Sequence, residues 1–427
     1  MKKLNTSPIS GMQEFLPSVQ AIFNDYKSKI AEVYHLHGFQ NIETPTIDRN
    51  EILFAKAGGD TEKQIYRVIK TDESAEDSNQ SLRFDHTVPL ARYIVEHESE
   101  LAFPFRVSQI GRNFRGERAQ KGRFREFYQC DADIIGRGEL PIEYDAQVIF
   151  VFYEAVKSFV KTPLKIRLNN RKFLSGILDN LGLANQSAKI YNIIDHAEKV
   201  PTETTIAELT DLGLSEPDVV KITTLINTHG KVEDIVALDF VEPDARGLDE
   251  LIAVMNELKS LGLPETDYEI DLKIVRGLDY YTGTVFETIL PDYPEVGSIG
   301  GGGRYDNLAS NFTDQKFPGV GASIGLSRLF YILRENNLLD EVISAPIDVA
   351  LMPISPIEKS ACYELAEKLR QKGYSVDVIL SGKKLGDMMK HAAKIAKSGI
   401  VVGENEVKTG EYFVKDFTTG ESKSLNI

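Results

Sequence analysis

Two short segments of this 427-residue chain carry side chains suited to binding an amino acid joined to a nucleotide. The first is Phe114-Arg115-Gly116-Glu117, and the basic residues that follow it are Arg118, Lys121, Arg123 and Arg125. The second is Arg276-Gly277-Leu278-Asp279-Tyr280-Tyr281-Thr282-Gly283. Arginine binds phosphate and carboxylate oxygens in pairs, and an ionised carboxylate accepts hydrogen bonds from amino groups such as that of adenine. The two segments are therefore candidates for two walls of one pocket.

Side-chain alternation extends the first segment into a polar strand face. Residues two apart in a β-strand point to the same side, so Arg115 and Glu117 share a face unless the turn has already begun at this point. An isolated Arg-x-Glu pair, however, is commonly a cross-strand ion pair on a surface hairpin. By the same rule Gln129, Asp131 and Asp133 share a face on the next strand. A buried polar group without a partner costs about 1 to 3 kcal/mol, so this second face favours a polar ligand.

Other residues of the chain have two plausible uses each. Asp85 and Thr87 stand just before a helix expected to begin near Pro89, where they could bind an ammonium group or, more commonly, cap the helix. Phe127 could stack on a base, although an aromatic residue in a strand more often belongs to the core. Arg276 could bind an anion or pack as a cation on a tyrosine ring. Residue type alone leaves these alternatives open.

Several common sites are absent from the sequence. Residues 300–304 lack the Gly-Lys-Ser/Thr ending of a P-loop, and residues 319–325 miss the dinucleotide-binding glycine spacing by one. The seven histidines include no His-Glu-x-x-His motif, so the residues that would bind a metal ion are unknown. No set of nucleophile, base and orienting acid stands out. This favours chemistry in which the substrate supplies its own nucleophile.

Size and composition restrict the class of protein. A chain of 427 residues is too long for one ordinary core, so we expect two or three domains. No apolar run reaches the roughly 18 residues of a membrane helix and no secretory signal is apparent, so no membrane contact is expected. Cys130 and Cys362 are too distant in sequence to suggest a disulfide framework, which fits a reducing cytoplasm.

Charge is distributed unevenly along the chain. The net charge is -15, yet residues 106–125 carry seven basic side chains against Glu117 alone. A basic run by itself is most often a solvated face. Here the run is interleaved with glycine and aromatic residues, which favours phosphates and bases as partners.

The spacing of apolar residues predicts the elements of the first part of the chain. A long helix is expected over residues 18–37. The strand predicted after it, residues 39–47, carries Pro45 and should therefore lie at an edge or interface. Residues 106–135 alternate as a long antiparallel hairpin with its turn near residues 117–121.

The pattern of residues changes twice in the second part of the chain. Acidic helical segments fill residues 171–262, without a cluster of catalytic residue types. Strands return at residues 268–275, 284–290 and 298–305, and a glycine-rich segment opens a helix within residues 319–333. After Pro346, strand and helix alternate, which predicts a small α/β domain with mostly parallel strands.

These segments together resemble the motifs of class II aminoacyl-tRNA synthetases. The early helix and its proline-bearing strand resemble motif 1, the Arg115 segment resembles motif 2, and the glycine-rich segment ending at Arg328 resembles motif 3. Residues 276–283, RGLDYYTG, resemble the signature of the histidyl-tRNA synthetases within that class, and GGGRYD at residues 301–306 fits the same pattern. The resemblance spans nearly the whole chain.

The resemblance implies a fold and an assembly. It predicts an α+β catalytic domain built on an antiparallel sheet, with a helical insertion, plus a C-terminal α/β anticodon-binding domain. The expected limits are residues 1–170 and 263–338 for the two parts of the catalytic domain, 171–262 for the insertion and 346–427 for the anticodon-binding domain. Motif 1 is the dimer-building element of the class, so a homodimer is expected.

The resemblance also implies roles for individual residues. Arg276 and Arg115 would be catalytic, binding the reacting carboxylate and the α-phosphate. The residues expected to bind ATP are Arg115, Glu117, Arg123, Phe127 and Arg328. The residues expected to bind histidine are Asp85, Thr87, Gln129, Asp133, Tyr281 and Tyr305. Asp85 and Asp133 stand where many bacterial members have glutamate, which resembles the eukaryotic-type branch.

Contacts with tRNA are expected at two places. Arg118 and Gln120, in the turn of motif 2, would contact the acceptor end. In the C-terminal domain, Lys390, Lys394 and Lys397 would share one face of a helix over residues 385–397 and contact the tRNA, although such lysines also commonly face water alone.

The expected activity is that of a histidine-tRNA ligase. Such an enzyme uses ATP and ATP-bound Mg2+ to form histidyl-adenylate and pyrophosphate, and then transfers histidine to the 3′ end of its tRNA. The alternative is a non-catalytic, synthetase-like regulatory subunit of histidine biosynthesis. Those paralogues usually lose some pocket arginines and the C-terminal domain, whereas this chain keeps Arg115, Arg276, Arg328 and residues 346–427.

Overall fold

The computed structural model describes residues 3–55, 62–72, 74, 77–118, 122–198, 200–242, 245–275, 281–340, 347–380 and 384–425. Arg276 and Gln120, which have expected roles above, lie outside the described residues. The chain forms two compact units, and each is described by itself. One unit comprises residues 1–13 with 27–337, and the other comprises residues 14–26 with 338–427. Among the described residues, no helix has the length and apolar composition to cross a bilayer.

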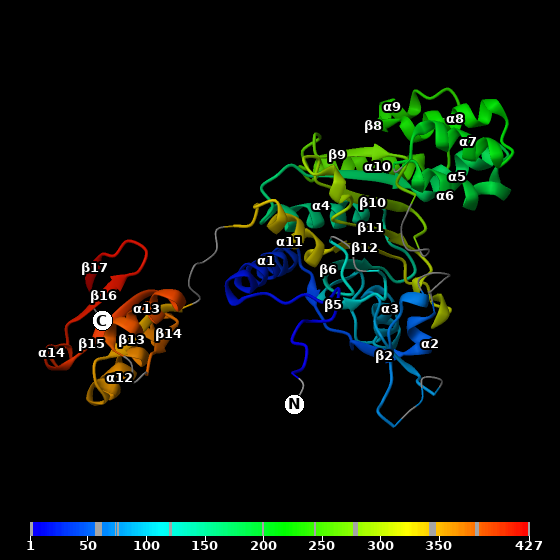
Figure 1. Ribbon diagram of the computed structural model, residues 1–427. Helices are drawn as coiled ribbons and strands as arrows, with labels where there is room; N and C mark the ends of the chain where they lie inside the picture. The colour runs from blue at the N-terminus through cyan, green and yellow to red at the C-terminus, as the bar shows by residue number, and fades with distance from the viewer. Residues whose placement is uncertain are drawn as a thin grey trace. The chain divides into compact units, whose positions relative to one another are not determined.

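A nine-stranded sheet organises the larger unit, with the strand order β1-β5-β6-β12-β11-β10-β7-β9-β8 (Figure 1). The strands are β1 (Gln40–Asn41), β5 (Phe105–Phe114), β6 (Glu126–Ile135), β7 (Lys165–Asn170), β8 (His229–Gly230), β9 (Tyr268–Asp271), β10 (Thr284–Ile289), β11 (Gly300–Tyr305) and β12 (Gly319–Ile324). The strands from β5 to β7 in this order are antiparallel to their neighbours, whereas β1 pairs with β5 and β9 pairs with β7 in parallel. The prediction of an antiparallel sheet is thus confirmed, with parallel pairs near its margins.

The predicted hairpin is the pair β5 and β6, which bond from Phe105 opposite Ile135 to Phe114 opposite Glu126. Its alternation is as expected, because Cys130, Ala132 and Ile134 are buried on the face opposite to Gln129 and Asp133. Helix α1 (Pro17–Leu36) matches the long early helix, and its Tyr34 hydroxyl donates to the Cys130 carbonyl at 2.9 Å.

The strand predicted over residues 39–47 is wrong as a single element. The chain instead forms β1 at the edge of the large sheet and β2 (Ile47–Arg49) in a separate three-stranded sheet with β4 (Gln80–Leu82) and β3 (Arg67–Val68). Pro45 lies between the two strands. Proline has no N–H to donate to a ladder, which fits the position of Pro45 outside both strands.

Helices cover and brace the large sheet. Helix α3 (Thr87–Glu96) buries Leu90 and Ile94 against Phe105 and Val107 of β5. Helices α4 (Glu143–Lys157) and α11 (Leu326–Glu335) pack on β6, while the short helix α2 (Asn50–Leu53) packs on α3. Both glycine-rich stretches are strands of the sheet, β11 and β12, which agrees with the absence of a P-loop motif.

A buried ion pair anchors β11 to the helix side of the sheet. The Arg304 guanidinium lies 2.7 Å from Oδ1 of Asp145 on α4, and it also donates to the carbonyls of Leu140 and Pro141, both at 3.0 Å. The two charged side chains are 7% and 0% exposed. Removing one partner would leave a buried charge unpaired, so this arginine has a structural use.

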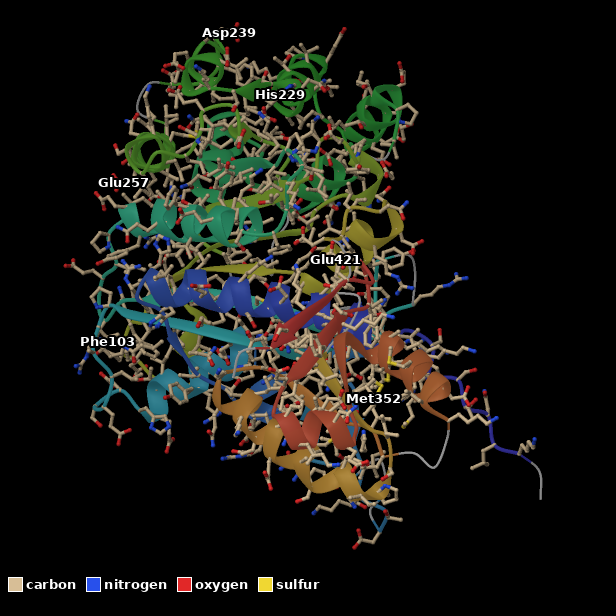
Figure 2. The ribbon with its side chains drawn as sticks, turned by 90° about the vertical axis from the view of Figure 1, so that its left-hand side faces the viewer. Phe103, His229, Asp239, Glu257, Met352 and Glu421 are labelled. Atoms are coloured by element: carbon tan, nitrogen blue, oxygen red, sulfur yellow. The ribbon has the colours of Figure 1, made fainter. Side chains whose placement is uncertain are left out.

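The segment predicted to be helical contains α5 (Arg171–Asn180), α6 (Ser187–His196), α7 (Thr202–Asp211), α8 (Glu216–Asn227), α9 (Val232–Val236) and α10 (Leu248–Ser260). The Asn170 side chain accepts from the Lys172 N–H at 2.9 Å and so caps α5. Figure 2 shows His229 beside these helices, in the short strand β8, which joins the large sheet next to β9. A two-residue strand is too short to be found from apolar spacing.

The smaller unit contains a five-stranded sheet with the order β14-β13-β15-β16-β17. Its elements are β13 (Ile347–Pro353), α12 (Lys359–Gln371), β14 (Val376–Val378), α13 (Leu385–Ile395), β15 (Ala396–Val402), α14 (Glu404–Thr409), β16 (Tyr412–Asp416) and β17 (Ser422–Leu425). Strands β14, β13 and β15 are parallel, as predicted, and β16 and β17 extend the sheet as an antiparallel hairpin. Met352, labelled in Figure 2, lies in the core with Met388 and Ala392 of α13.

The predicted lysine face of α13 is wrong for Lys397. The helix ends at Ile395, and Lys397 lies in β15, where its ammonium group is 2.8 Å from Oδ1 of Asp348. Alanine and lysine favour a helix, which is why the helical pattern continues through residue 397 in the sequence. Pairing of Ala396 with Ile347 of β13 overrides that local preference. Lys390 and Lys394 remain together as exposed residues of α13.

Candidate active site

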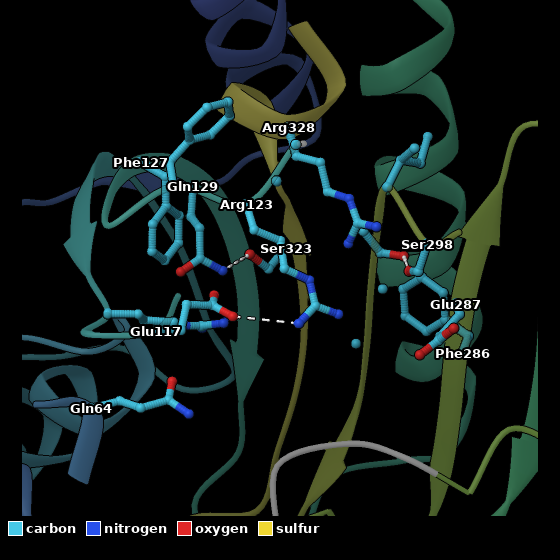
Figure 3. Close-up of a pocket in the computed structure, with 18 of the residues that line it drawn as sticks. Gln64, Glu117, Arg123, Phe127, Gln129, Phe286, Glu287, Ser298, Ser323 and Arg328 are labelled. Carbon is cyan, nitrogen blue, oxygen red and sulfur yellow. Dashed lines mark hydrogen bonds and ion pairs between the residues drawn. The ribbon is translucent and has the colours of Figure 1, made fainter. Parts of the chain in front are cut away.

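Two adjoining cavities lie at the centre of the large sheet. The larger has a volume of about 440 Å³ and is bounded by the connection of the β5–β6 hairpin, by β10 to β12 and by α11 (Figure 3). The smaller, of about 40 Å³, lies over the middle of β6 and β12. Four residues line both cavities: Arg115, Gln129, Tyr281 and Ser323. A ligand that occupies both cavities must therefore pass these side chains.

The larger cavity collects every residue that the sequence assigns to ATP. Arg115, Glu117, Arg123, Phe127 and Arg328 all line it. Figure 3 shows Glu117 and Arg123 joined by an ion pair, in which Nη1 of Arg123 is 3.4 Å from Oε2 of Glu117. Burial lowers the pKa of Arg328, and the positive charge of Arg123 lowers it further. Two neighbouring guanidinium groups make this end of the cavity suited to a multiply charged anion.

Arg115 is held at the boundary of the two cavities by aromatic rings. Its guanidinium carbon lies 4.2 Å from the ring centre of Phe84 and 5.0 Å from that of Phe127. The Nε atom also donates to the carbonyl of Phe84 at 3.3 Å. Stacking and this hydrogen bond restrict the side chain to one orientation, so its charge is directed before any ligand arrives.

The smaller cavity collects every residue that the sequence assigns to histidine: Asp85, Thr87, Gln129, Asp133, Tyr281 and Tyr305. At its floor the Tyr305 hydroxyl donates to Oδ1 of Asp133 at 2.7 Å. Burial and, after it, the negative charge of Asp131 together raise the pKa of Asp133 to about 8, against the opposing effect of the Tyr305 hydrogen bond. Asp133 therefore carries a proton at neutral pH when the cavity holds no cation.

Asp85 is placed for both of the uses that the sequence left open. Its Oδ1 atom accepts the Val88 N–H at 3.1 Å, which caps the start of α3. The same side chain, 6% exposed, lines the smaller cavity. Burial raises the pKa of Asp85, whereas the Val88 N–H and the charge of Arg115 lower it. The capping bond thus fixes the carboxylate in place for a ligand.

Sequence reasoning missed several residues that line the cavities. Asp131 alternates with Gln129 and Asp133, so the strand pattern contained a signal for it. Ser323 and Gly321 lie on β12 opposite Asp131 and Asp133, and no local signal marks them. A Cβ atom at residue 321 would lie 1.9 Å from Oδ1 of Asp133, so glycine is needed there for the carboxylate to fit. Glu287 and Ser298 line the larger cavity, and no sequence motif marks them either.

Other predicted residues are not brought to the cavities. Arg118 is exposed in the connection between β5 and β6 and is not among the described residues that line either cavity. Lys390, Lys394 and Lys397 belong to the smaller unit. In the described part of the chain there is no group of three or more His, Cys, Asp or Glu residues that could hold a metal ion.

The chemistry of the two cavities is complementary. The larger offers guanidinium groups, an aromatic ring and the Glu117 carboxylate, which suit the phosphates and base of a nucleotide. The smaller offers carboxylates, hydroxyls and an amide, which suit a small ligand with an ammonium group and a second polar group. Their shared boundary is the place where two such ligands would meet.

Comparisons with known proteins agree on one family. The model of the histidyl-tRNA synthetase family matches residues 11–329, and the model of an anticodon binding domain matches residues 348–427. A histidine–tRNA ligase of Clostridium tetani is 43% identical, with 100% of this chain and 98% of the relative covered. A histidine–tRNA ligase of Clostridium acetobutylicum is 41% identical, with 100% and 99% covered.

Solved structures give the same result. The crystal structure of histidyl-tRNA synthetase from Nostoc sp. PCC 7120 superposes with a TM-score of 0.88 at 34% identity, with 99% of this chain and 97% of that chain covered. A protein from Bacillus halodurans described as an ATP phosphoribosyltransferase regulatory subunit/histidyl-tRNA synthetase has a TM-score of 0.78 at 22% identity, covering 94% of this chain and 99% of its own. The latter likeness shows the fold alone.

Proposed function

The chain belongs to the histidyl-tRNA synthetase family, and from that membership we propose that it activates histidine with ATP and transfers it to its tRNA. The observation that carries this proposal is the pair of adjoining cavities, each lined by one expected set of residues. Relatives about 40% identical over the full chain are ligases, which supports this function over the regulatory alternative. The test is histidine-dependent exchange of pyrophosphate into ATP, followed by aminoacylation of tRNA. A protein that binds histidine but supports no exchange would be a regulatory subunit.

In the first step a carboxylate oxygen of histidine attacks the α-phosphorus of ATP. The new P–O bond gives histidyl-adenylate, and the bond to the leaving pyrophosphate breaks. Histidine in the smaller cavity and ATP in the larger would bring these atoms together near Arg115, which lines both. The protein then contributes orientation and compensation of negative charge, so no protein nucleophile is required.

We assign the smaller cavity to histidine. Asp85, Thr87 and Gln129 would bind the α-ammonium group with a carboxylate, a hydroxyl and an amide oxygen. Asp133, with Tyr281 and Tyr305, would bind the imidazole. A neutral imidazole has one donor and one acceptor nitrogen, which a carboxyl and a hydroxyl can each read.

We assign the larger cavity to ATP. The Phe127 ring would stack on adenine, Glu117 would accept from its amino group, and Arg123 and Arg328 would bind the phosphates. Magnesium would enter bound to ATP, since the ion takes most of its ligands from phosphate and water and needs only one or two carboxylates. Glu287 offers such a carboxylate in this cavity.

The domain limits expected from the sequence remain our proposal for the division of labour. Residues 1–170 and 263–338 would catalyse, 171–262 would form the inserted module, and 346–427 would bind the anticodon stem and loop. A homodimer in the cytoplasm is the proposed state of the protein. Size measurement by light scattering tests the dimer directly.

Histidine binding should release a proton from Asp133. The pKa of this carboxyl is about 8 in the empty cavity, and the incoming ammonium group favours ionised carboxylates, so the bound pKa must be lower. Between those two values the free protein holds a proton that the complex lacks. Raising the pH therefore strengthens binding, by up to about tenfold per pH unit for one full proton, until it levels off above pH 8.

Calorimetry in buffers of different ionisation enthalpy measures this release. A pH range from about 7 to 8 lies above the ordinary pKa of an imidazole, so titration of the ligand contributes little. The Asp133→Asn variant cannot titrate at this position and should bind without the release. Equal proton release in the variant and the parent would assign the proton to another group.

Changing Arg118 and Gln120 together to alanine should slow aminoacylation while leaving pyrophosphate exchange close to that of the parent. Arg118 is exposed and not among the residues that line the cavities, so its loss should not disturb ATP or histidine. Each lost contact with a base is worth about 1 to 3 kcal/mol of discrimination. Single-turnover transfer from preformed adenylate measures the affected step. Equal losses in exchange and transfer would instead assign these residues to ATP.

Lys390 and Lys394 should contribute to tRNA binding through phosphate contacts. Changing both to alanine should weaken binding and lower the slope of log K against log salt by roughly 0.7 to 0.9 for each lost contact. Lys397→Ala is the matched control, because that ammonium group is paired with Asp348 at 2.8 Å. An unchanged salt slope in the double variant would exclude this part of α13 from the contact.

A further inference from the structure

A hydrogen-bond network borders the smaller cavity, and of its members only Gln129 has a role assigned above. Asn113 Nδ2 donates to Gln129 Oε1 at 2.7 Å, and Gln129 Nε2 donates to Ser323 Oγ at 2.6 Å. Ser323 Oγ donates to Asp131 Oδ1 at 2.6 Å, and Asp131 Oδ2 lies 2.9 Å from His86 Nδ1. Gln129 and Ser323 lie at the boundary of the two cavities and line both.

The contact with Asp131 determines which group donates in the neighbouring hydrogen bonds of this network. Ser323 Oγ donates to Asp131 Oδ1, and a hydroxyl has a single proton to give. The Ser323 oxygen is then left as an acceptor for Gln129, which must present its NH2 group. A flipped Gln129 would bring its carbonyl oxygen against the Ser323 oxygen and its NH2 group against that of Asn113. Only one orientation of the Gln129 amide is therefore compatible with Asp131.

His86 holds the other side of Asp131. Its Nδ1 atom faces Oδ2, and its Nε2 atom is buried without a hydrogen-bond partner among the described residues. Nδ1 is thus the ring nitrogen that has a partner among the described residues, and an N–H there donates to Asp131. Room for this ring is provided by Gly111 of β5, where a Cβ atom would lie 3.2 Å from Nε2 and 2.6 Å from Nη2 of Arg83.

Three members of this hydrogen-bond network are held in place by burial. His86 is 1% exposed, Asn113 is 0% exposed and Asp131 is 4% exposed, so solvent cannot take the place of a partner that these three lose, whereas Gln129 and Ser323 are half-buried. Hydrogen bonds inside a protein are stronger than those in water, and an unpaired member is correspondingly costly. The partners come from distant parts of the sequence. Asp131 and Ser323 lie 192 residues apart and meet through the pairing of β6 with β12.

We propose that Asp131, clamped between His86 and Ser323, is a positioning residue that keeps the Gln129 amide oxygen in place to accept the ammonium group of the amino-acid substrate. The inference rests on the proposed function, because it concerns the same cavity. Loss of this hydrogen-bond network should therefore weaken the binding of ligands with an ammonium group and leave the binding of ligands without one unchanged. A purely structural role would weaken both.

The test uses the full chain with Ser323→Ala, which removes the link between Asp131 and Gln129. We expect the KM for histidine to rise about tenfold in pyrophosphate exchange, as for loss of one well-ordered hydrogen bond, with kcat and the KM for ATP within about twofold. Ser323→Thr keeps a hydroxyl and should recover most of the affinity. Ser327→Ala is the matched control, because Ser327 also bonds β6, through the Tyr128 N–H at 2.8 Å, but does not line either cavity.

Two inhibitors separate positioning from a structural effect. Histidinol keeps the ammonium group, and its inhibition constant should rise about tenfold in Ser323→Ala, as for histidine. Imidazolepropionate lacks the ammonium group, and its constant should change less than about twofold because no contact with Gln129 is lost. Equal changes for both inhibitors, or an unchanged KM for histidine, would overturn the inference. Failure of the parent chain to bind histidine in calorimetry would instead overturn the proposed function.

Discussion

Replacing Arg115 by alanine should lower the rate of histidine-dependent pyrophosphate exchange by about 10² to 10³. Arg115 lines both cavities, and its guanidinium is oriented by the Phe84 and Phe127 rings at 4.2 and 5.0 Å. In the proposed reaction negative charge develops where the two cavities meet, so a preoriented cation there would act more on the transition state than on either bound substrate. The loss should therefore appear in kcat of the exchange reaction rather than in the affinity for histidine.

Two further variants make this prediction specific to Arg115. Arg115→Lys keeps a positive charge but loses the planar stack between the rings, so it should recover only part of the rate. Arg112→Ala is the matched control, because Arg112 lies in β5 close before Arg115 but pairs with Glu126 at 2.8 Å and is not among the described residues lining the cavities. A control that loses as much rate as Arg115→Ala would point to damage of the hairpin.

Local patterns were sufficient to predict the polar face of β6. The alternation of Gln129, Asp131 and Asp133 is a property of neighbouring residues, and strand geometry alone turns it into one face. Local patterns also predicted the helix over residues 18–37 and the alternation of strands and helices after Pro346. Elements of this kind need no knowledge of the rest of the chain. Assigning ligands to that face required the resemblance to a family.

Long-range pairing is what the sequence could not predict. Tyr305 bonds Asp133 across 172 residues, and Ser323 bonds Asp131 across 192, both because β11, β12 and β6 are neighbours in the sheet. Register between strands so far apart in sequence is decided by packing of the whole sheet. The error at Lys397 has the same origin, because a good helical sequence becomes a strand when β13 offers a partner.

Asp85 shows why the choice between a structural and a functional use can be false. A carboxylate that caps α3 through the Val88 N–H is held without rotamer freedom, which is also the condition for accurate binding of an ammonium group. The aromatic stack at Arg115 is a second case, in which a packed cation is at the same time directed at the cavities. At this site the structural use of a residue is compatible with the binding role that we propose for it.

Replacing Arg276 by alanine should abolish most pyrophosphate exchange, by about 10² to 10³, while histidine affinity changes less than about tenfold. The residue lies outside the described part of the chain, so this prediction comes from the RGLDYYTG segment, of which Tyr281 lines both cavities. An arginine that binds the reacting carboxylate and the α-phosphate together would act mainly once the two are joined. Rapid-quench measurement of adenylate formation, with calorimetry for histidine, separates the two effects.

The matched control for Arg276→Ala is Arg137→Ala, which removes an arginine that is 55% exposed and paired with Glu98 on the surface. Its exchange rate should stay within about twofold of the parent, because an exposed ion pair is worth little. Arg276→Lys should recover less than Arg115→Lys, since one ammonium group cannot bridge a carboxylate and a phosphate in the manner of a planar guanidinium. Normal adenylate formation in Arg276→Ala would leave Arg115, with Arg123 and Arg328, as the cations that act on the transition state.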